Sequence, residues 1–232
     1  MPHRRPLPRS FYQRSALAVA PDLIGKVLVT DDGRSVRLVE VEAYLGEGVD
    51  RASHAFRGER PRTRVMFGPP GRLYVYFTYG MHWCANAVCG DAGVGEAVLI
   101  RAGIPLTGID AMRAARGERW PDRDLCRGPA RLTQALGLSG VDGTDLVTGA
   151  PAGVRILDDG WVVPTDAAMV TGPRIGLTTG LESPWRWWVG GDPHVSATRN
   201  PRPRPTLPVA MPDQGDSGSA GGWASRDRDR DG

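Results

Sequence analysis

Runs in which apolar and polar residues alternate, as they do in β-strands, dominate the first half of the chain. Two such runs, 26–30 and 36–44, flank an Asp-Gly turn at 31–33, and this arrangement predicts a β-hairpin. Further strands are expected at 72–78, 84–89, 97–105, 154–157, 168–171 and 187–189. Helices are expected at 11–20, at 107–116 with Thr107 as N-cap, and at 129–136 with Pro129 near its first position; Pro21 is expected to open a short turn through Ile24.

Together these elements predict an α+β fold for a single mixed domain over residues 11–199. We expect its core to be a curved, largely antiparallel, open barrel-like β-sheet flanked by helices. Residues 1–10 are rich in proline and arginine and are expected to be flexible. Residues 200–232 combine low complexity with five Arg against five Asp, so we expect a disordered tail.

Charge and composition narrow the function classes. The net charge is +3, but five arginines against Glu59 alone fall between Arg57 and Arg72. Such a stretch is either a solvated loop or a surface for phosphate, to which a guanidinium donates paired hydrogen bonds. Three cysteines and four histidines lack the spacing of a disulfide framework or metal site. We therefore expect no metal site, and we also expect no cofactor. No apolar run is long enough to span a bilayer, so we expect no membrane association and a cytoplasmic location.

A pair of glutamates lies on one strand. Alternate side chains of a strand share a face, so Glu40, Glu42 and Tyr44 face one way and the apolar residues between them the other. A solvated strand surface would show the same pattern. The long arginine-rich loop after Tyr44, and a second strand whose Tyr74 and Tyr76 also share a face, favour a functional surface instead.

Two further features suggest chemistry. Arg101 lies within an apolar strand, and a buried guanidinium needs a partner, for which Glu42 is a candidate. Tyr79 and Met81 flank Gly80 at the end of a strand, and an apolar tip of this kind can enter a base step and open it.

Several motifs in order resemble the alkyladenine (3-methyladenine) DNA glycosylase family, and the similarity covers residues 11–199. They are Glu-Ala-Tyr-Leu-Gly at 42–46, His54 with the arginine-rich loop, Leu-Tyr-Val-Tyr at 73–76, Tyr-Gly-Met at 79–81, Cys-x-Asn at 84–86, Val-Leu-Ile-Arg-Ala at 98–102, and Gly-Pro followed by Gln-Ala-Leu between 128 and 136.

The resemblance implies a role for each matching residue. Glu42 would be the general base that activates water, with Arg101 and the main-chain carbonyl of Ile175 helping to hold that water. Tyr44, His54 and Tyr76 would sandwich a flipped base above Asn86, which would exclude the 2-amino group of guanine. Tyr79 would fill the gap in the duplex with Met81 nearby, and Arg57, Arg60, Arg62, Arg64 and Arg131 would contact phosphates.

The implied function is base excision by a monomer acting on double-stranded DNA that contains alkylated or deaminated purines, within the nucleoid if the source is bacterial. No lysine lies among the motifs to form a Schiff base, so we expect hydrolysis that leaves an abasic site without strand cleavage. Two alternatives are a non-catalytic nucleic-acid-binding domain and a sugar hydrolase that uses Glu40 and Glu42 as a carboxylate pair.

Overall fold

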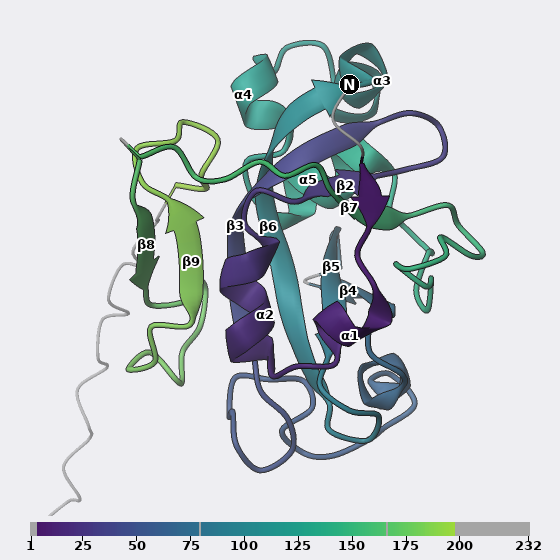
Figure 1. Cartoon of the computed structure of the whole chain (residues 1–232), viewed down its shortest axis with the longest axis vertical. Coiled ribbons are helices and arrows are strands. Elements are labelled where there is room, and N and C mark those ends of the chain that lie inside the picture. Colours follow the sequence, from purple (N-terminus) through teal and green to yellow (C-terminus); the bar gives the residue numbers. More distant parts are fainter. Residues whose placement is uncertain (1–3, 79, 166, 198–232) are drawn as a thin grey trace, which may run out of the picture. The chain divides into compact units, whose positions relative to one another are not determined.

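The computed structural model describes residues 4–78, 80–165 and 167–197 (Figure 1). Its elements in chain order are β1 (Arg5–Pro6), α1 (Arg9–Tyr12), α2 (Ala16–Leu23), β2 (Val27–Val29), β3 (Ser35–Tyr44), the 3-10 helix η1 (Arg64–Phe67), β4 (Leu73–Thr78), β5 (His82–Cys89), β6 (Glu96–Thr107), α3 (Ile109–Arg116), α4 (Asp122–Leu125), α5 (Pro129–Leu136), β7 (Arg155–Asp158), β8 (Met169–Gly172) and β9 (Arg186–Val189). Within these ranges no helix combines the length and the apolar character that crossing a membrane requires. The tail expected at 200–232 lies outside the described residues.

The strands form one antiparallel sheet in the order β1-β7-β2-β3-β6-β5-β4, and this sheet is not closed into a barrel. The long strands β3 and β6 run through its centre, while β9 pairs with β3 at Glu40–Glu42 and with β8 on its other side. Figure 1 shows α3, α4 and α5 gathered at one end of β3 and β6, and the β8–β9 pair beside β3. The predicted α+β class with a largely antiparallel, open sheet is therefore confirmed.

The two faces of β3 meet different surroundings. Val39, Val41 and Ala43 are fully buried in the main hydrophobic cluster, together with the apolar side of α2. Glu40 and Glu42 point to the opposite face, as the alternation predicts, yet both are also fully buried. Segments from the C-terminal part of the chain therefore cover the face that carries the two glutamates, and the alternative of a solvated strand surface is wrong.

The register of β3 and β6 is irregular where the charged residues lie. Leu38 pairs with Gly103 and Glu40 with Ala102, whereas Val41 pairs with Ile100, so Arg101 has no directly paired residue on β3. An unpaired residue of this kind is a β-bulge, which bends the strand and re-aims a side chain. The irregularity therefore occurs at the pair Glu40 and Arg101.

Several predicted boundaries differ in the structure. The helix expected over 11–20 is two helices, because Ser15 accepts a hydrogen bond from the Leu17 amide and starts α2 anew. Pro21, expected in a separate turn, lies inside α2, whose buried residues hold it against the core. The N-cap of α3 is Gly108, at φ 70°, rather than Thr107. Residues 1–10 were expected to be flexible; of these, β1 pairs with β7 and Leu7 is buried.

Candidate active site

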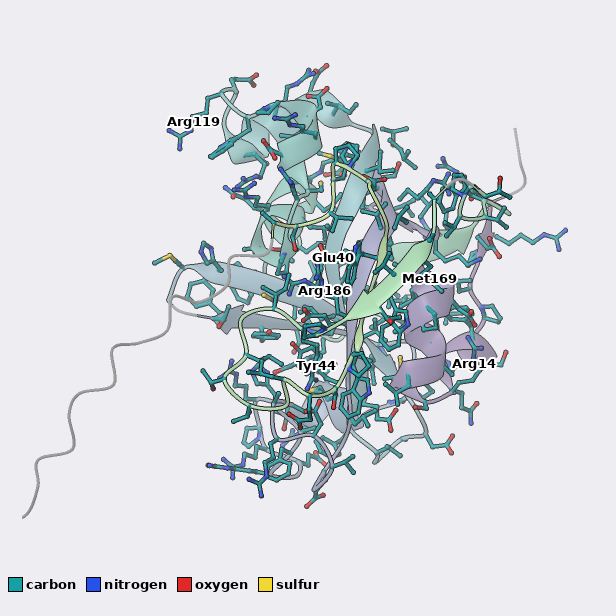
Figure 2. All side chains as sticks on the ribbon, turned by 90° about the vertical axis from the view of Figure 1, so that its left-hand side faces the viewer. Arg14, Glu40, Tyr44, Arg119, Met169 and Arg186 are labelled. Atoms are coloured by element: carbon teal, nitrogen blue, oxygen red, sulfur yellow. The ribbon has the colours of Figure 1, made fainter. Side chains whose placement is uncertain are left out.

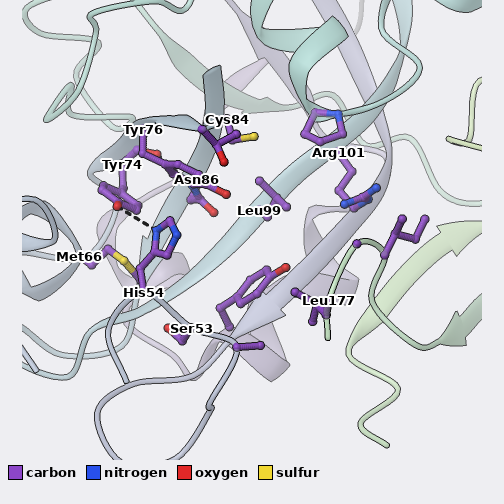
Figure 3. A pocket seen from close by; sticks show the side chains of 16 residues that line it. Ser53, His54, Met66, Tyr74, Tyr76, Cys84, Asn86, Leu99, Arg101 and Leu177 are labelled. Carbon is purple, nitrogen blue, oxygen red and sulfur yellow. Dashed lines mark hydrogen bonds between the residues drawn. The ribbon is translucent and has the colours of Figure 1, made fainter. Parts of the chain in front are cut away.

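A pocket of about 340 Å³ opens on the sheet face that carries Glu42. It is lined by Tyr44, Ala52, Ser53, His54, Met66, Tyr74, Tyr76, Thr78, Cys84, Asn86, Leu99, Arg101, Pro129, Ile175, Gly176 and Leu177. Figure 3 shows His54, Tyr74, Tyr76 and Asn86 on one side of this space and Arg101 and Leu177 on the other. Six of the residues that the sequence singled out thus line one cavity: Tyr44, His54, Tyr76, Asn86, Arg101 and Ile175.

Strand register explains why residues so distant in sequence meet. Glu42 pairs with Leu99, Leu99 with Asn86, and Asn86 with Tyr74, so these four residues form one row across β3, β6, β5 and β4. Three strand spacings separate β3 from β4, about 14 Å in all. Tyr44 on β3 and Tyr76 on β4 both line the cavity that spans these strands.

The carboxylate of Glu42 lies immediately behind the pocket wall, held by two hydrogen-bond donors and one ion pair. The Ile175 amide donates to its Oε1 at 2.7 Å and the Tyr44 hydroxyl donates to its Oε2 at 2.9 Å, while Arg101 Nη1 forms an ion pair with Oε2 at 3.2 Å. All three partner residues line the pocket. Burial, and then the neighbouring Glu42 charge, raise the pKa of Tyr44 well above its usual value, so this hydroxyl stays a donor. The expected pairing of Arg101 with Glu42 is present.

Glu40 is enclosed by a different set of partners. Its Oε1 accepts from Arg101 Nε at 3.0 Å, Arg186 Nε at 2.8 Å and Ser196 Oγ at 2.8 Å, and its Oε2 accepts from the Ser196 amide at 2.7 Å. Figure 2 shows Glu40 and Arg186 side by side near the centre of the molecule, close to Tyr44. Because its oxygens face Arg186 and Ser196, which lie outside the pocket lining, the paired-carboxylate arrangement of a sugar hydrolase is not formed.

A second buried ion pair supports the pocket wall on the β3 side. Arg174 donates to Asp50 at 2.6 and 2.9 Å and to the Ala43 carbonyl at 3.1 Å, and both side chains of the pair are almost completely buried. The Arg174 guanidinium also lies 4.5 Å from the centre of the Tyr44 ring, within the range of a cation–π contact. Arg174 thus ties the β8–β9 connection, which carries Ile175, to the end of β3.

Three aromatic rings form the wall on the β4 side. His54 meets Tyr76 edge-on with ring centres 4.5 Å apart, Tyr74 stacks on Tyr76 at 5.4 Å, and His54 Nδ1 lies 3.1 Å from the Tyr74 hydroxyl (Figure 3). Burial, with a further contribution from Arg62, lowers the pKa of His54. Burial raises the pKa of Tyr74 to about 12. At neutral pH this wall is therefore uncharged.

Asn86 lies at the floor, 4% exposed, and its Nδ2 donates to the Tyr74 carbonyl at 3.1 Å. This bond fixes the orientation of the amide group. Because Asn86 occupies the same row as Glu42, the floor lies at the level of the carboxylate across the sheet.

The predicted DNA contacts lie outside the pocket lining. Met81 is 68% exposed, whereas Tyr79 lies outside the described residues. Arg62 is exposed and its guanidinium lies 5.7 Å from the Tyr76 ring centre. Arg57, Arg60 and Arg64 are also exposed, and Arg64 has only a loose contact with Glu59 at 3.8 Å. Arg131 is partly buried beside the Trp120 ring, at 5.2 Å.

Five residues that hold the site were not predicted from sequence to do so: Glu40, Asp50, Arg174, Arg186 and Ser196. Glu40 was recognised as a neighbour of Glu42 but had no role. The others carry no spacing signal, because their partners lie up to 156 positions away in the chain. A long functional loop after Tyr44 was expected, and Asp50 lies within it. Its position in that loop is the one sequence signal that could have indicated a role for Asp50.

Comparison with known proteins agrees with this geometry. The model of the methylpurine-DNA glycosylase family matches residues 10–193. A protein of Burkholderia lata, provisionally named 3-methyladenine DNA glycosylase, is 58% identical over 191 residues, covering 82% of this chain and 90% of the relative. Relatives with the same provisional name in Streptomyces avermitilis and Chlorobaculum parvum are 48% and 46% identical, covering 88% and 84% of this chain and 96% and 92% of the relatives. The chain therefore belongs to the methylpurine-DNA glycosylase family and is a base-excision-repair enzyme that hydrolyses N-glycosyl bonds in DNA.

Proposed function

We propose that the pocket receives an alkylated or deaminated purine flipped out of double-stranded DNA, and that Glu42 activates the water that releases it. The observation that carries this proposal is a buried carboxylate, oriented by two hydrogen-bond donors and an ion pair, directly behind the wall of an aromatic pocket. Water gives a proton to Glu42 while its oxygen bonds to C1′ of the nucleotide. The N-glycosidic bond breaks with its electron pair leaving on the base, and an abasic site results.

The donors around Glu42 leave capacity for that water. Each carboxylate oxygen has two acceptor positions, and Oε1 takes only the Ile175 amide among the described contacts. The remaining position on Oε1 suits a water. We assign Arg101 and the Ile175 carbonyl as its other ligands, because both residues line the pocket beside Glu42.

The rings select flat bases and favour damaged ones. Many alkylated purines carry positive charge, which the π faces of Tyr44 and Tyr76 attract. A neutral His54 adds contact without repelling such a base. Flipping costs a few kcal/mol, and less where damage has weakened pairing. We assign Asn86, fixed at the floor, as the group that clashes with the 2-amino group of guanine. 7-Methylguanine carries the same amino group, but its positive charge makes it a better leaving group, and this offsets the clash.

The DNA partner is a duplex that the arginine-rich loop and an apolar wedge hold open. Exposed arginines at 57, 60, 62 and 64 provide phosphate contacts, and exposed Met81 accompanies Tyr79 in the wedge. We propose that the protein acts on this duplex as a monomer, in the cytoplasm or nucleoid. Tyr79→Ala should reduce excision more than it weakens duplex binding; equal excision by the variant and the parent protein would remove the wedge from the proposal.

The role of Glu42 is tested with Glu42→Gln, which keeps shape and removes the basic carboxylate. Single-turnover release of 7-methylguanine from a duplex should fall by at least about 10²-fold, since a positioned base contributes on the order of 10²–10⁴. The Kd for the same duplex should stay within about 2-fold, because the pocket and the phosphate contacts are unchanged. Excision at the parental rate would show that Glu42 is not the base.

A panel of duplexes carrying 3-methyladenine, 7-methylguanine, hypoxanthine or ethenoadenine then ranks the substrates. Products are scored with and without alkali, because an abasic site breaks only when alkali is added. Strand breaks without alkali would contradict the proposal that the enzyme is monofunctional.

A further inference from the structure

Glu40 is a buried charge for which the reaction described above has no use. Its side chain is 0% exposed and absent from the pocket lining, yet it accepts four hydrogen bonds from three residues. A buried carboxylate is costly unless it is paired and fully hydrogen-bonded. Glu40 meets that condition, and the partner it shares with Glu42 indicates what it does.

Arg101 lies between the two glutamates. Its Nε donates to Glu40 at 3.0 Å, and its Nη1 lies 3.2 Å from Glu42 Oε2. A guanidinium that faces one carboxylate ordinarily forms two parallel hydrogen bonds with it. Here the Nε side is taken by Glu40, so Glu42 receives a single, longer contact.

We propose that Glu40 is a positioning residue: it holds Arg101 so that the guanidinium orients Glu42 without forming a bidentate ion pair with it, and thereby keeps Glu42 basic enough to take a proton from water. This inference rests on the proposed role of Glu42. It adds a residue that touches neither the DNA nor the water.

The charge balance of the cluster supports this role. Glu40 and Glu42 face Arg101 and Arg186, two negative and two positive groups with no net charge. Burial acts to raise the pKa of Glu40, but Arg101, Arg186 and Ser196 outweigh it and lower that pKa, so Glu40 is charged at neutral pH. Without the Glu40 charge, two cations would face Glu42 alone, and Arg101 would be free to turn both edges toward it.

Apart from Glu40, Arg101 and Arg186, the titratable side chains around Glu42 are either paired or uncharged. The full set that faces Glu42 from the surrounding elements is Arg101 on β6, Arg186 on β9, Arg174 with Asp50, Tyr44 and Glu40 on β3, Tyr76 on β4 and Cys84 on β5. Arg174 is paired with Asp50, and burial raises the pKa values of Tyr44, Tyr76 and Cys84, which keeps them neutral. Glu40 is therefore the group whose charge offsets Arg101 and Arg186.

Local backbone structure favours the same conclusion. The register irregularity at Arg101 re-aims its side chain where Glu40 receives it. At the other side of Glu40, the Ser196 amide and hydroxyl both donate to it from a segment near the end of the described chain. Glu40 is thereby fixed from three directions, as positioning of Arg101 to within a fraction of an ångström requires.

The test is the pH dependence of single-turnover 7-methylguanine excision from a duplex. Excision requires the carboxylate form of Glu42, so the rate falls on the acid side of the pH profile. Glu40→Gln removes a negative charge about 6–7 Å away, which favours the negatively charged form of Glu42. The acid limb should move about 1 pH unit to lower pH, and the plateau rate should fall by up to about 10-fold because a weaker base accepts the proton less readily.

Two further variants make the test decisive. Arg186→Gln removes a positive charge from the same cluster and should move the acid limb to higher pH. Asp22→Asn is the matched control. It removes one negative charge from α2, where Asp22 forms an exposed pair with Arg14, and it should leave the profile unchanged. Duplex Kd should stay within about 2-fold in all three variants.

The outcomes separate this inference from the proposal on which it depends. If Glu42→Gln abolishes excision while Glu40→Gln leaves the acid limb in place or moves it upward, the positioning role of Glu40 is wrong and the general base stands. If Glu42→Gln excises normally, the general base itself is wrong. Should Glu40→Gln fail to fold, the direction of the Arg186→Gln shift decides, and an unmoved or downward limb overturns the inference.

Discussion

Two glutamates that lie two residues apart on the same strand face have different surroundings, and the location of their partners distinguishes them. Arg186 and Ser196, which hold Glu40, lie outside the pocket lining. The partners of Glu42, which are Ile175, Tyr44 and Arg101, all line the pocket. The alternation of β3 placed both on one face, but it did not distinguish them. The resemblance implies that Glu42 is the base, and the contacts show that Glu40 faces partners outside the pocket.

At the same scale, the pH dependence of lesion binding should depend on His54. Burial and Arg62 lower its pKa, so the ring is neutral at pH 7 and becomes charged only as the pH falls through that lowered value. A protonated ring repels a cationic base. In a Glu42→Gln background, affinity for a 7-methylguanine duplex relative to an ethenoadenine duplex should therefore decrease at low pH.

Fluorescence anisotropy from pH 8 down to pH 5 measures that ratio. His54→Gln, which has no charge to gain, provides the control and should keep the ratio constant. A ratio that falls equally in both proteins would mean that another group responds to pH.

At the scale of elements, the site depends on the connection between β8 and β9. This connection brings Ile175 to Glu42, and Arg174 ties it to β3 through the Ala43 carbonyl, Asp50 and the Tyr44 ring. Neither β8 nor β9 carries a pocket residue itself. β9 pairs with β3, and β8 pairs with β9, which sets where the connection lies, so a short strand pair far along the sequence completes the pocket wall beside Glu42.

Asp50→Asn should therefore destabilise the whole protein. It leaves the fully buried Arg174 guanidinium without its charged partner, and breaking a buried pair in this way costs about 3–5 kcal/mol in the free energy of unfolding. Asp22→Asn breaks a comparable but exposed pair with Arg14 and should cost no more than about 1 kcal/mol. Urea denaturation compares the two, and equal losses would contradict the role assigned to the buried pair.

At the scale of the whole molecule, the net charge of +3 says little about DNA binding, because the distribution of charge matters more. The exposed arginines at 57, 60, 62 and 64 belong to the loop that also supplies Ser53 and His54 to the pocket. Phosphate contacts from this loop would position the duplex relative to the pocket mouth. Many other arginines are instead used inside the fold, in pairs such as Arg37 with Asp159.

Duplex binding should accordingly weaken with salt in proportion to the loop contacts. The double variant Arg60→Gln/Arg64→Gln should reduce the slope of log K against log salt by up to about 2, since each lost contact accounts for about 0.9. Damaged and undamaged duplexes should be affected alike. The double variant Arg14→Gln/Arg155→Gln carries the same charge change at exposed pairs with Asp22 and Asp31, and an equal effect there would show that only net charge matters.

The sequence by itself determined the strands, the face on which Glu42 and Tyr44 lie, and, through ordered motifs, the family and most pocket residues. These follow from local patterns, because alternation and turn chemistry act between neighbouring residues. Only the tertiary structure decided that Glu40 is buried against Arg101, Arg186 and Ser196, and that Asp50 holds Arg174. Partners 61 to 156 positions apart are brought together by strand register and by a bulge, and no local pattern encodes such a pairing.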